Sequence, residues 1–439
     1  MNGRVMRLSA AEAPLRTSRR ESGAFGHPTQ GPSAKLAPRA AASHPQRVRR
    51  WFGLGLLVCV AGCAGAGSSD GPEVSDPTAD DSQVASEAAS ETVAELDVDS
   101  ETVAASEGGS EEAEGESTGE GADESGDEGA AESGNDAGAD AVAAVMAMDG
   151  SESTSIGGPR DGRIEGAIAL PASGPGFRSN PRRPNAEGSY GTVEMVQALV
   201  RASAVVQEEL PGGELTINDL GLPQGGAISH HGSHRAGRDV DVLFYLIDRD
   251  GEPMPSVGAF LDERGRGFDF RELDDPRDDH LVRIDLPRTW RWIQALLEGP
   301  DADLVQRVFV VEHLRTLLLR QATRARAPAA IRERFAAITC QPGYPHDDHL
   351  HIRFYCTTED MAAGCEDSGP TYRWRRVALR EAGLRPVINR PRRDRPQAPT
   401  TSSAEARQNA GRMAERVEEW LERREAWADQ PHPGRTFCR

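Results

Sequence analysis

One stretch of this chain limits where a folded domain can lie. Residues 64–150 contain no Lys or Arg but 25 Asp and Glu, and the remainder is mainly Ala, Gly and Ser. Such a composition cannot bury enough apolar surface to offset the conformational entropy of the chain. We therefore expect this acidic stretch to be a disordered tether, and we expect the folded domain to follow it.

The charge of the whole chain describes the acidic stretch rather than the expected domain. The formal net charge is −20, but residues 1–63 are basic and residues 151–439 are close to neutral. The sequence has no basic patch interleaved with aromatic residues of the kind that binds nucleic acid. We therefore expect no nucleic-acid partner.

An export signal precedes the acidic stretch. Arg47, Arg49 and Arg50 come before the apolar run WFGLGLLVCVAG, which is followed by Cys63. This order of basic, apolar and small residues is typical of a secretory signal, and the run is too short to span a bilayer. An ordinary signal peptide with an incidental cysteine is the alternative to a lipoprotein signal.

The end of the signal, VAGC at residues 60–63, resembles a bacterial lipobox. In a lipobox the cysteine is lipidated and becomes the first residue of the mature protein. Ala64 rather than Asp follows Cys63, which by resemblance favours the outer membrane. The resemblance implies a periplasmic protein that a lipid on Cys63 anchors to the membrane.

Four cysteines follow the signal, namely Cys340, Cys356, Cys365 and Cys438. An even number in an exported segment favours two disulfides, and no pair has the CxxC spacing of a thiolate zinc site. Three pairings are open. We favour Cys356 with Cys365, which closes a short polar loop, and Cys340 with Cys438, which would tie the C-terminal tail to the domain.

The pattern of apolar residues predicts an α+β domain that begins near Thr192. Apolar residues recur at helical spacing from Val193, around Trp290 and after Glu312. Strand-like runs occupy residues 214–220, 240–247, 308–311 and 349–356. Helices and strands do not alternate regularly, so we expect a small, mainly antiparallel sheet flanked by helices.

Composition divides the chain into four parts. Residues 1–62 form an N-terminal extension with the signal peptide, 63–190 the acidic tether with an extended lead-in rich in Gly, Pro and Ser, 191–394 the folded domain, and 395–439 a Pro-rich linker with a charged helix. Met413, Val417 and Leu421 lie on one stripe of this helix. We expect that stripe to dock onto the same domain.

Six of the eleven histidines gather in two short segments, as His230, His231, His234, His346, His349 and His351. Side chains at i and i+2 of a strand share a face, so His349 and His351 would point away from the apolar residues between them. Asp239 and Asp241 would share a face for the same reason. Two neighbouring strands could then direct these side chains to one point, and His234 on the preceding loop could close the site.

Imidazoles with a carboxylate suit Zn²⁺, which takes three protein ligands in catalytic sites and keeps one position for water. The metal lowers the pKa of that water to about 7, so that hydroxide forms at neutral pH. A closed structural zinc site and solvated surface histidines are the alternatives. A structural site is saturated by four ligands and does not need further imidazoles beside it, so we favour a catalytic zinc.

The spacing H-x6-D from His234 to Asp241, with a later His-x-His, resembles the superfamily of lysostaphin-type peptidases and D-Ala-D-Ala metallopeptidases. The fuller patterns HGSHRAGRDVD and HDDHLHIR resemble penicillin-insensitive murein endopeptidases, over roughly residues 190–390. The resemblance implies that His234, Asp241 and His351 bind zinc. It implies that His349 is the general base or stabilises the tetrahedral intermediate.

The resemblance also suggests roles for His346 and His231, and the residues themselves suggest roles for Asp239 and Arg353. His346 and His231 would flank the centre and contact the leaving amine or a substrate carboxylate. Asp239 would orient a zinc-bound imidazole. Arg353 would either bind a substrate carboxylate or pair with Asp347 or Asp348.

The activity that the resemblance implies is zinc-dependent hydrolysis of the D-alanyl to diaminopimelate cross-link between the stem peptides of peptidoglycan. A D,D- or L,D-carboxypeptidase of the same fold is one alternative. A non-catalytic zinc module that binds murein is another. A lipid-anchored protein that acts through its acidic stretch is the third.

Overall fold

The structure, a computed structural model, describes residues 129–181, 183, 185–390, 400–429 and 438. The predicted signal peptide, Cys63 and residues 64–128 of the acidic stretch lie outside these described residues. Helices and strands are mixed along the described part, and most strand pairs are antiparallel. The predicted α+β class is confirmed.

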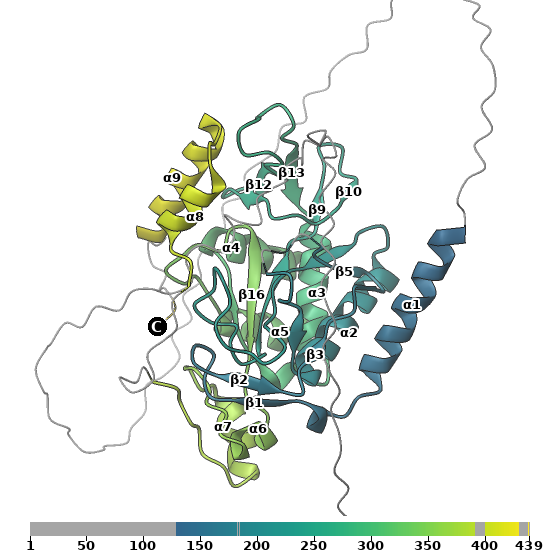
Figure 1. Cartoon of the computed structure of the whole chain (residues 1–439), viewed down its shortest axis with the longest axis vertical. Helices are drawn as coiled ribbons and strands as arrows, with labels where there is room; N and C mark the ends of the chain where they lie inside the picture. The colour runs from purple at the N-terminus through teal and green to yellow at the C-terminus, as the bar shows by residue number, and fades with distance from the viewer. Residues whose placement is uncertain (1–128, 182, 184, 391–399, 430–437, 439) are drawn as a thin grey trace, which may run out of the picture. The chain divides into compact units, whose positions relative to one another are not determined.

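A seven-stranded sheet lies at the centre of the fold (Figure 1). In spatial order its strands are β15 (Thr339–Cys340), β14 (Val305–Phe309), β16 (His349–Phe354), β8 (Asp239–Leu243), β7 (Leu215–Ile217), β5 (Phe177–Ser179) and β4 (Ser173–Gly174). Neighbouring strands are antiparallel, except that β14 is parallel to β15 and β5 is parallel to β7. The strands expected around residues 214–220, 308–311 and 349–356 belong to this sheet, whereas the run 240–247 is divided between β8 of this sheet and β9 (Leu246–Ile247) of a second sheet.

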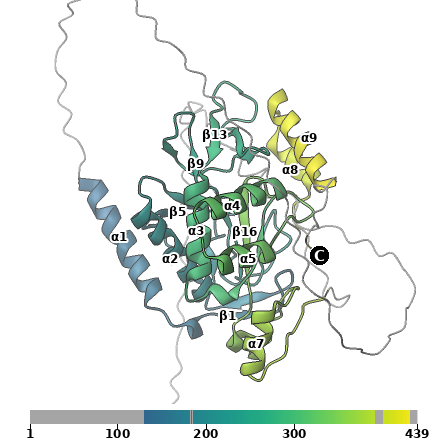
Figure 2. The same ribbon diagram turned by 180° about the vertical axis from the view of Figure 1, so that it is seen from behind.

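Four helices cover one face of this sheet, and Figures 1 and 2 show them on the same side of β16. They are α2 (Val193–Glu209), α3 (Leu286–Glu298), α4 (Glu312–Arg324) and α5 (Ala329–Ile338). Val240 of β8 and Ile352 of β16 are buried in one apolar cluster with residues of these helices, such as Leu199, Trp292 and Phe335. The polar residues that alternate with the apolar ones on β8 and β16 therefore face away from the helices.

Smaller elements surround the central sheet. A five-stranded antiparallel sheet contains, in spatial order, β10 (Pro253–Met254), β9 (Leu246–Ile247), β13 (Leu281–Ile284), β12 (Arg266–Phe268) and β11 (Phe260–Leu261). Two strand pairs, β1 (Thr154–Ile156) with β2 (Arg163–Glu165) and β3 (Ile168–Ala169) with β6 (Tyr190–Gly191), are also antiparallel. Short helices are α6 (Thr358–Ala362), α7 (Arg373–Glu381) and the 3-10 turns η2 (Gly150–Glu152) and η3 (Ala302–Leu304).

The fold begins earlier in the chain than the sequence predicted. Helix α1 (Gly129–Met146) lies in the acidic stretch that we expected to be disordered, and β1 to β6 replace the expected extended lead-in. Val145 of α1 is buried, and the side chain of Gln197 on α2 donates hydrogen bonds to the carbonyls of Val145 and Met148. For residues 129–146 the composition was a poor guide, because a few apolar residues on one helix face are sufficient when a second helix packs against them.

The C-terminal tail docks onto the domain, as its apolar stripe predicted, but as two helices rather than one. These are α8 (Ser403–Ala410) and α9 (Glu415–Asp429), and the chain between them passes through Gly411 at φ +79°. Val417 and Leu421 are buried in a cluster with Phe260 and Phe270, and Met413 packs against that cluster. Figures 1 and 2 both show α8 and α9 at one side of the domain.

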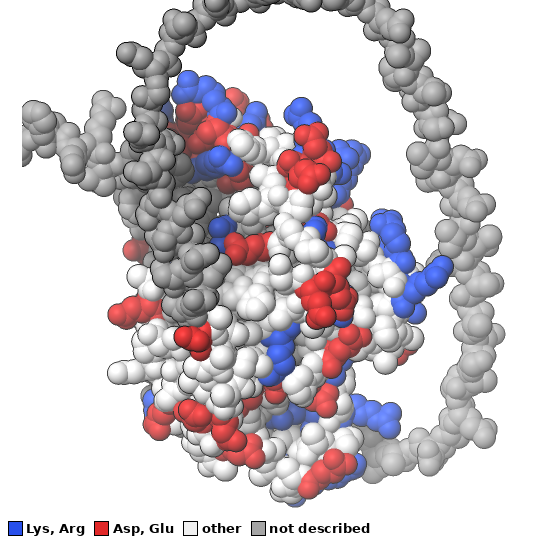
Figure 3. All heavy atoms as spheres, turned by 90° about the vertical axis from the view of Figure 1, so that its right-hand side faces the viewer, with Lys and Arg blue, Asp and Glu red and all other residues white. Residues whose placement is uncertain are grey.

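The surface of the described part mixes both signs of charge. Figure 3 shows acidic and basic side chains interspersed over one face of the molecule. Among the helices that the structure describes, none is both long and apolar enough to cross a membrane.

Both favoured disulfides are present. Cys340 is bonded to Cys438, 98 residues later in the chain, and Cys356 is bonded to Cys365, nine residues later. The first links β15 to the C-terminal tail, and the second closes the segment that contains α6.

The two disulfides should differ in their contribution to stability. In the loop-entropy account, a loop of about 100 residues stabilises the fold by roughly 5 kcal/mol and one of about ten residues by roughly 3 kcal/mol. We expect the double variant Cys340→Ser, Cys438→Ser to lose more free energy of unfolding than Cys356→Ser, Cys365→Ser. Chemical denaturation of the three proteins measures this, and equal losses would contradict the loop-entropy account here.

Candidate metal centre

The centre is built on the polar face of two paired strands. In the antiparallel register of β8 and β16, His351 lies opposite Asp241 and Arg353 lies opposite Asp239. The predicted convergence of these side chains is therefore present. His349 lies two residues before His351 on the same face of β16.

Loops with strained backbones bring further histidines to these strands. His230 and His234, on the loop before β8, and His346, on the loop before β16, have φ values of +68°, +64° and +56°. Residues other than glycine rarely adopt positive φ angles, and each such residue costs about 1–3 kcal/mol of conformational free energy. Gly225 helps the first loop to turn, because a Cβ there would lie 2.3 Å from the carbonyl oxygen of Arg235.

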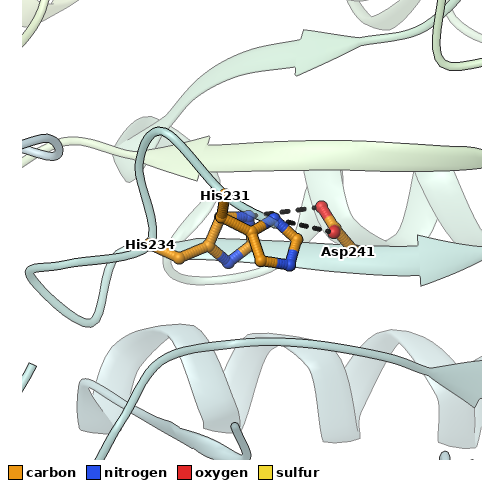
Figure 4. Close-up of side chains that lie close together, drawn as sticks. All are labelled: His231, His234 and Asp241. Carbon is orange, nitrogen blue, oxygen red and sulfur yellow. Dashed lines mark ion pairs between the residues drawn. The ribbon is translucent and has the colours of Figure 1, made fainter. Parts of the chain in front are cut away.

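Four imidazoles face the carboxylate of Asp241, which is almost completely buried. Its Oδ1 lies 3.3 Å from Nε2 of His234, 3.3 Å from Nδ1 of His351 and 3.6 Å from Nε2 of His349. Its Oδ2 lies 3.7 Å from Nδ1 of His231. Figure 4 shows His231 and His234 directed from their loop toward Asp241 on β8.

Each of these imidazoles is held by a hydrogen bond from its other ring nitrogen. The partner is the Leu220 carbonyl for His234 at 2.5 Å and Asp219 for His231 at 2.9 Å. Asp239 accepts from His351 at 2.9 Å, and Asp348 accepts from His349 at 2.7 Å. Such bonds fix which nitrogen faces the centre and orient the imidazoles of metal sites.

His346 also lies beside the centre. Its Nδ1 is 2.9 Å from the carbonyl oxygen of Tyr344, and its ring centroid is 4.8 Å from that of His349. The six residues that the sequence analysis expected to bind metal or to act in catalysis are therefore gathered in one place.

The donor atoms at the centre fit a metal ion. Among the described residues, His231, His234 and Asp241 offer one ligand atom each, and these three atoms lie within 4.8 Å of one another. Imidazole nitrogen with carboxylate oxygen is a donor set that suits Zn²⁺ and related transition metals. His351 faces the same carboxylate from the adjacent strand, so the centre has more candidate ligands than a three-ligand site needs.

Electrostatics keep Asp241 in the form that binds metal. Burial alone would raise the pKa of this carboxyl group, but His349 and His234 hold it well below its usual value. Burial opposes the charge of His349 too, yet Asp241 and Asp348 raise its pKa to about 9. The pKa of His351 is lowered to about 4, chiefly by burial, so this imidazole is neutral, which is the form in which a histidine can bind metal.

The structure corrects one expected pairing. Arg353 donates from Nε to Asp239 at 2.6 Å, rather than pairing with Asp347 or Asp348. Asp239 therefore bonds both to Arg353 and to His351, which agrees with the orienting contact predicted for it.

The sequence analysis missed two groups that support the centre. Asp219 follows β7 and accepts a hydrogen bond from His231. Its position near the end of the strand-like run 214–220 could have indicated a role at the site. Arg424 of α9 is bonded to Asp347 and Asp348, and nothing in the sequence pattern indicated that contact.

Comparison with known proteins supports the resemblance that the motifs suggested. A model of the family described as penicillin-insensitive murein endopeptidase matches residues 155–373. The chain belongs to this family. The matched segment contains β8, β16 and every assigned site residue, and it ends before α8 and α9.

Individual members of the family are similar to this chain over about half of its length. The penicillin-insensitive murein endopeptidase of Klebsiella pneumoniae subsp. pneumoniae is 28% identical over 227 residues, which cover 50% of this chain and 72% of the relative. Those of Yersinia pestis bv. Antiqua and Haemophilus influenzae are 26% and 28% identical, over 49% and 50% of this chain and 71% and 68% of their own lengths. The tail after residue 373 lies outside the family model.

Proposed function

We propose that this family member is a zinc-dependent endopeptidase that hydrolyses the D-alanyl to diaminopimelate cross-link between the stem peptides of peptidoglycan. The observation that carries the proposal is the group of four imidazoles directed at the buried carboxylate of Asp241 in a chain of this family. The names of its relatives support murein as the substrate.

We assign the metal to His234, Asp241 and His351. Nε2 of His234 and Nδ1 of His351 approach the same oxygen of Asp241, Oδ1, each at 3.3 Å. His231 approaches the other oxygen at 3.7 Å. His351 and Asp241 lie on paired strands, whose positions are fixed by a ladder of backbone hydrogen bonds, whereas His231 lies on a loop.

Bound zinc supplies Lewis-acid activation of water and of the peptide carbonyl. Nε2 of His349 would take a proton from the attacking water and pass it to the leaving amine, because this nitrogen faces the centre while Asp348 accepts a hydrogen bond from Nδ1. His346 and His231 lie on either side and bind the leaving amine or a substrate carboxylate. Asp239 keeps Nδ1 of His351 directed at the metal by accepting a hydrogen bond from Nε2.

The ligand assignment predicts different metal contents for two histidine variants. His351→Ala removes a ligand, so both zinc content and activity should fall. His231→Ala should keep most of its zinc, because three ligands remain. Mass spectrometry of proteins purified without chelator measures the zinc, with about one ion per chain expected for the unsubstituted protein. If His231→Ala lost its zinc while His351→Ala kept it, His231 rather than His351 would be the third ligand.

The role of His349 predicts a variant that binds metal but turns over slowly. His349→Ala should retain nearly all of its zinc and lower kcat by about a hundredfold or more, the usual contribution of a positioned acid-base group. Steady-state kinetics on a defined cross-linked muropeptide measures this. Unchanged turnover in His349→Ala would remove the proposed proton transfer even if the zinc assignment were correct.

Digestion of purified peptidoglycan is the test of the proposed function. The protein that begins at residue 64 should convert cross-linked dimers into monomers whose masses identify the cleaved bond, and chelator should abolish the reaction. Release of terminal D-alanine from monomers would instead indicate a carboxypeptidase. Binding to murein without any product would indicate a non-catalytic module.

We further propose that the protein is a periplasmic lipoprotein anchored through Cys63, at the outer membrane. The support is the basic and apolar segment that precedes VAGC at residues 60–63. Cys63→Ala should then move the protein from the membrane fraction to the soluble periplasm. Membrane association that persists in Cys63→Ala would refute the lipid anchor.

A further inference from the structure

The C-terminal helix α9 places an arginine against two carboxylates beside the candidate metal centre. Arg424 is 1% exposed, although most residues around it on α9 are exposed. Its Nε donates to Oδ1 of Asp347 at 2.7 Å, and one of its terminal nitrogens donates to Oδ2 of Asp348 at 3.3 Å. The guanidinium carbon lies 3.8 Å from the ring centroid of Phe260 and 4.7 Å from that of Tyr344.

Asp348 connects this arginine to His349. Oδ2 of Asp348 accepts from Arg424, while Oδ1 accepts from Nδ1 of His349 at 2.7 Å. The two bonds use different oxygens of one carboxylate, so the position of the arginine restricts the rotation of the carboxylate. Nε2 of His349 lies at the other end of this chain of bonds, 3.6 Å from Oδ1 of Asp241.

The tail has its own attachments and does not need a buried charge to stay in place. Val417, Trp420 and Leu421 are buried against Phe260 and Phe270. The side chain of Gln341 donates to the carbonyl of Trp427 at 2.9 Å, and a disulfide joins the neighbouring Cys340 to Cys438. Buried ion pairs add little net stability compared with apolar packing, so stability alone does not account for Arg424.

We propose that Arg424 is a positioning residue for the proton transfer. It fixes the carboxylate of Asp348, which in turn keeps His349 directed at the metal centre. The inference rests on the proposed catalytic role of His349. It also makes a tail that lies outside the family model a working part of the active site.

The first test compares variants of two adjacent arginines. Arg424→Met retains an unbranched side chain but removes the charge and the hydrogen-bond donors. It should lower kcat by about 10- to 100-fold with little change in KM or zinc content. Arg424→Lys keeps the charge and should restore part of the lost kcat. Arg423→Met is the matched control, because Arg423 is exposed on the same helix and should behave like the unsubstituted protein.

A second variant controls for the possibility that Arg424→Met does not fold. Arg424→Met leaves Asp347 and Asp348 buried without their cation, so Arg424→Met is also combined with Asp347→Asn, which removes one of these charges. The combined variant should fold and still show the lowered kcat. Normal kcat in a folded protein with either Arg424→Met or the combined substitution would overturn the inference.

A double-mutant cycle tests whether Arg424 acts through Asp348. If it does, Asp348→Asn should lower kcat, and adding Arg424→Met should lower it little further. Multiplicative losses would mean that Arg424 acts by another route and would overturn the inference.

A readout without metal separates this inference from the proposed function. In metal-free protein, the NMR resonance of the Nδ1 proton of His349 should be protected from exchange in the unsubstituted chain and in Arg423→Met, and lost in Arg424→Met. If the unsubstituted protein cleaves no murein, the proposed function fails, whereas an unaltered His349 resonance in Arg424→Met contradicts the inference alone.

Discussion

The antiparallel register between β8 and β16 is the constraint on which the candidate metal centre depends. It places His351 opposite Asp241 and Arg353 opposite Asp239, while the alternate apolar residues enter the core. A slip of one residue would turn the polar site residues of one strand toward the helices. The apolar residues that α2, α3, α4 and α5 cover therefore determine the geometry of the site as well as the stability of the sheet.

The loops add histidines to the site at an energetic cost that local contacts offset. His234 and His346 adopt positive φ angles, which side chains other than glycine rarely occupy. The bond from His234 to the Leu220 carbonyl, and the bond from His346 to the Tyr344 carbonyl, hold the two rings in place. Backbone strain of this kind persists where surrounding contacts determine the conformation, and it is concentrated at functional sites.

Local rules predicted the parts of the structure that local physics determines. Alternation along residues 349–354 was enough to place His349 and His351 on one face, because the two-residue period of a strand does not depend on the remainder of the chain. The same rules failed for α1, whose Val145 is buried in a core cluster with residues that are distant in sequence, including residues of α2. They also failed for Arg424, which meets Asp347 across 77 residues of sequence with no spacing rule to relate them.

His349 and His351 of β16 are each held by a carboxylate that also accepts a hydrogen bond from an arginine. The two arginines come from different parts of the chain. His351 bonds to Asp239, which accepts from Arg353, and Arg353 is the next residue on the same face of β16. On the other side, β16 begins at His349, and the two residues before it, Asp347 and Asp348, both carry carboxylates, so this part of the chain offers no cation. Two adjacent buried carboxylates repel each other, and burial raises the pKa of Asp347 to about 6 although Arg424 opposes this. The cation that binds Asp348 beside His349 therefore comes from another element, α9.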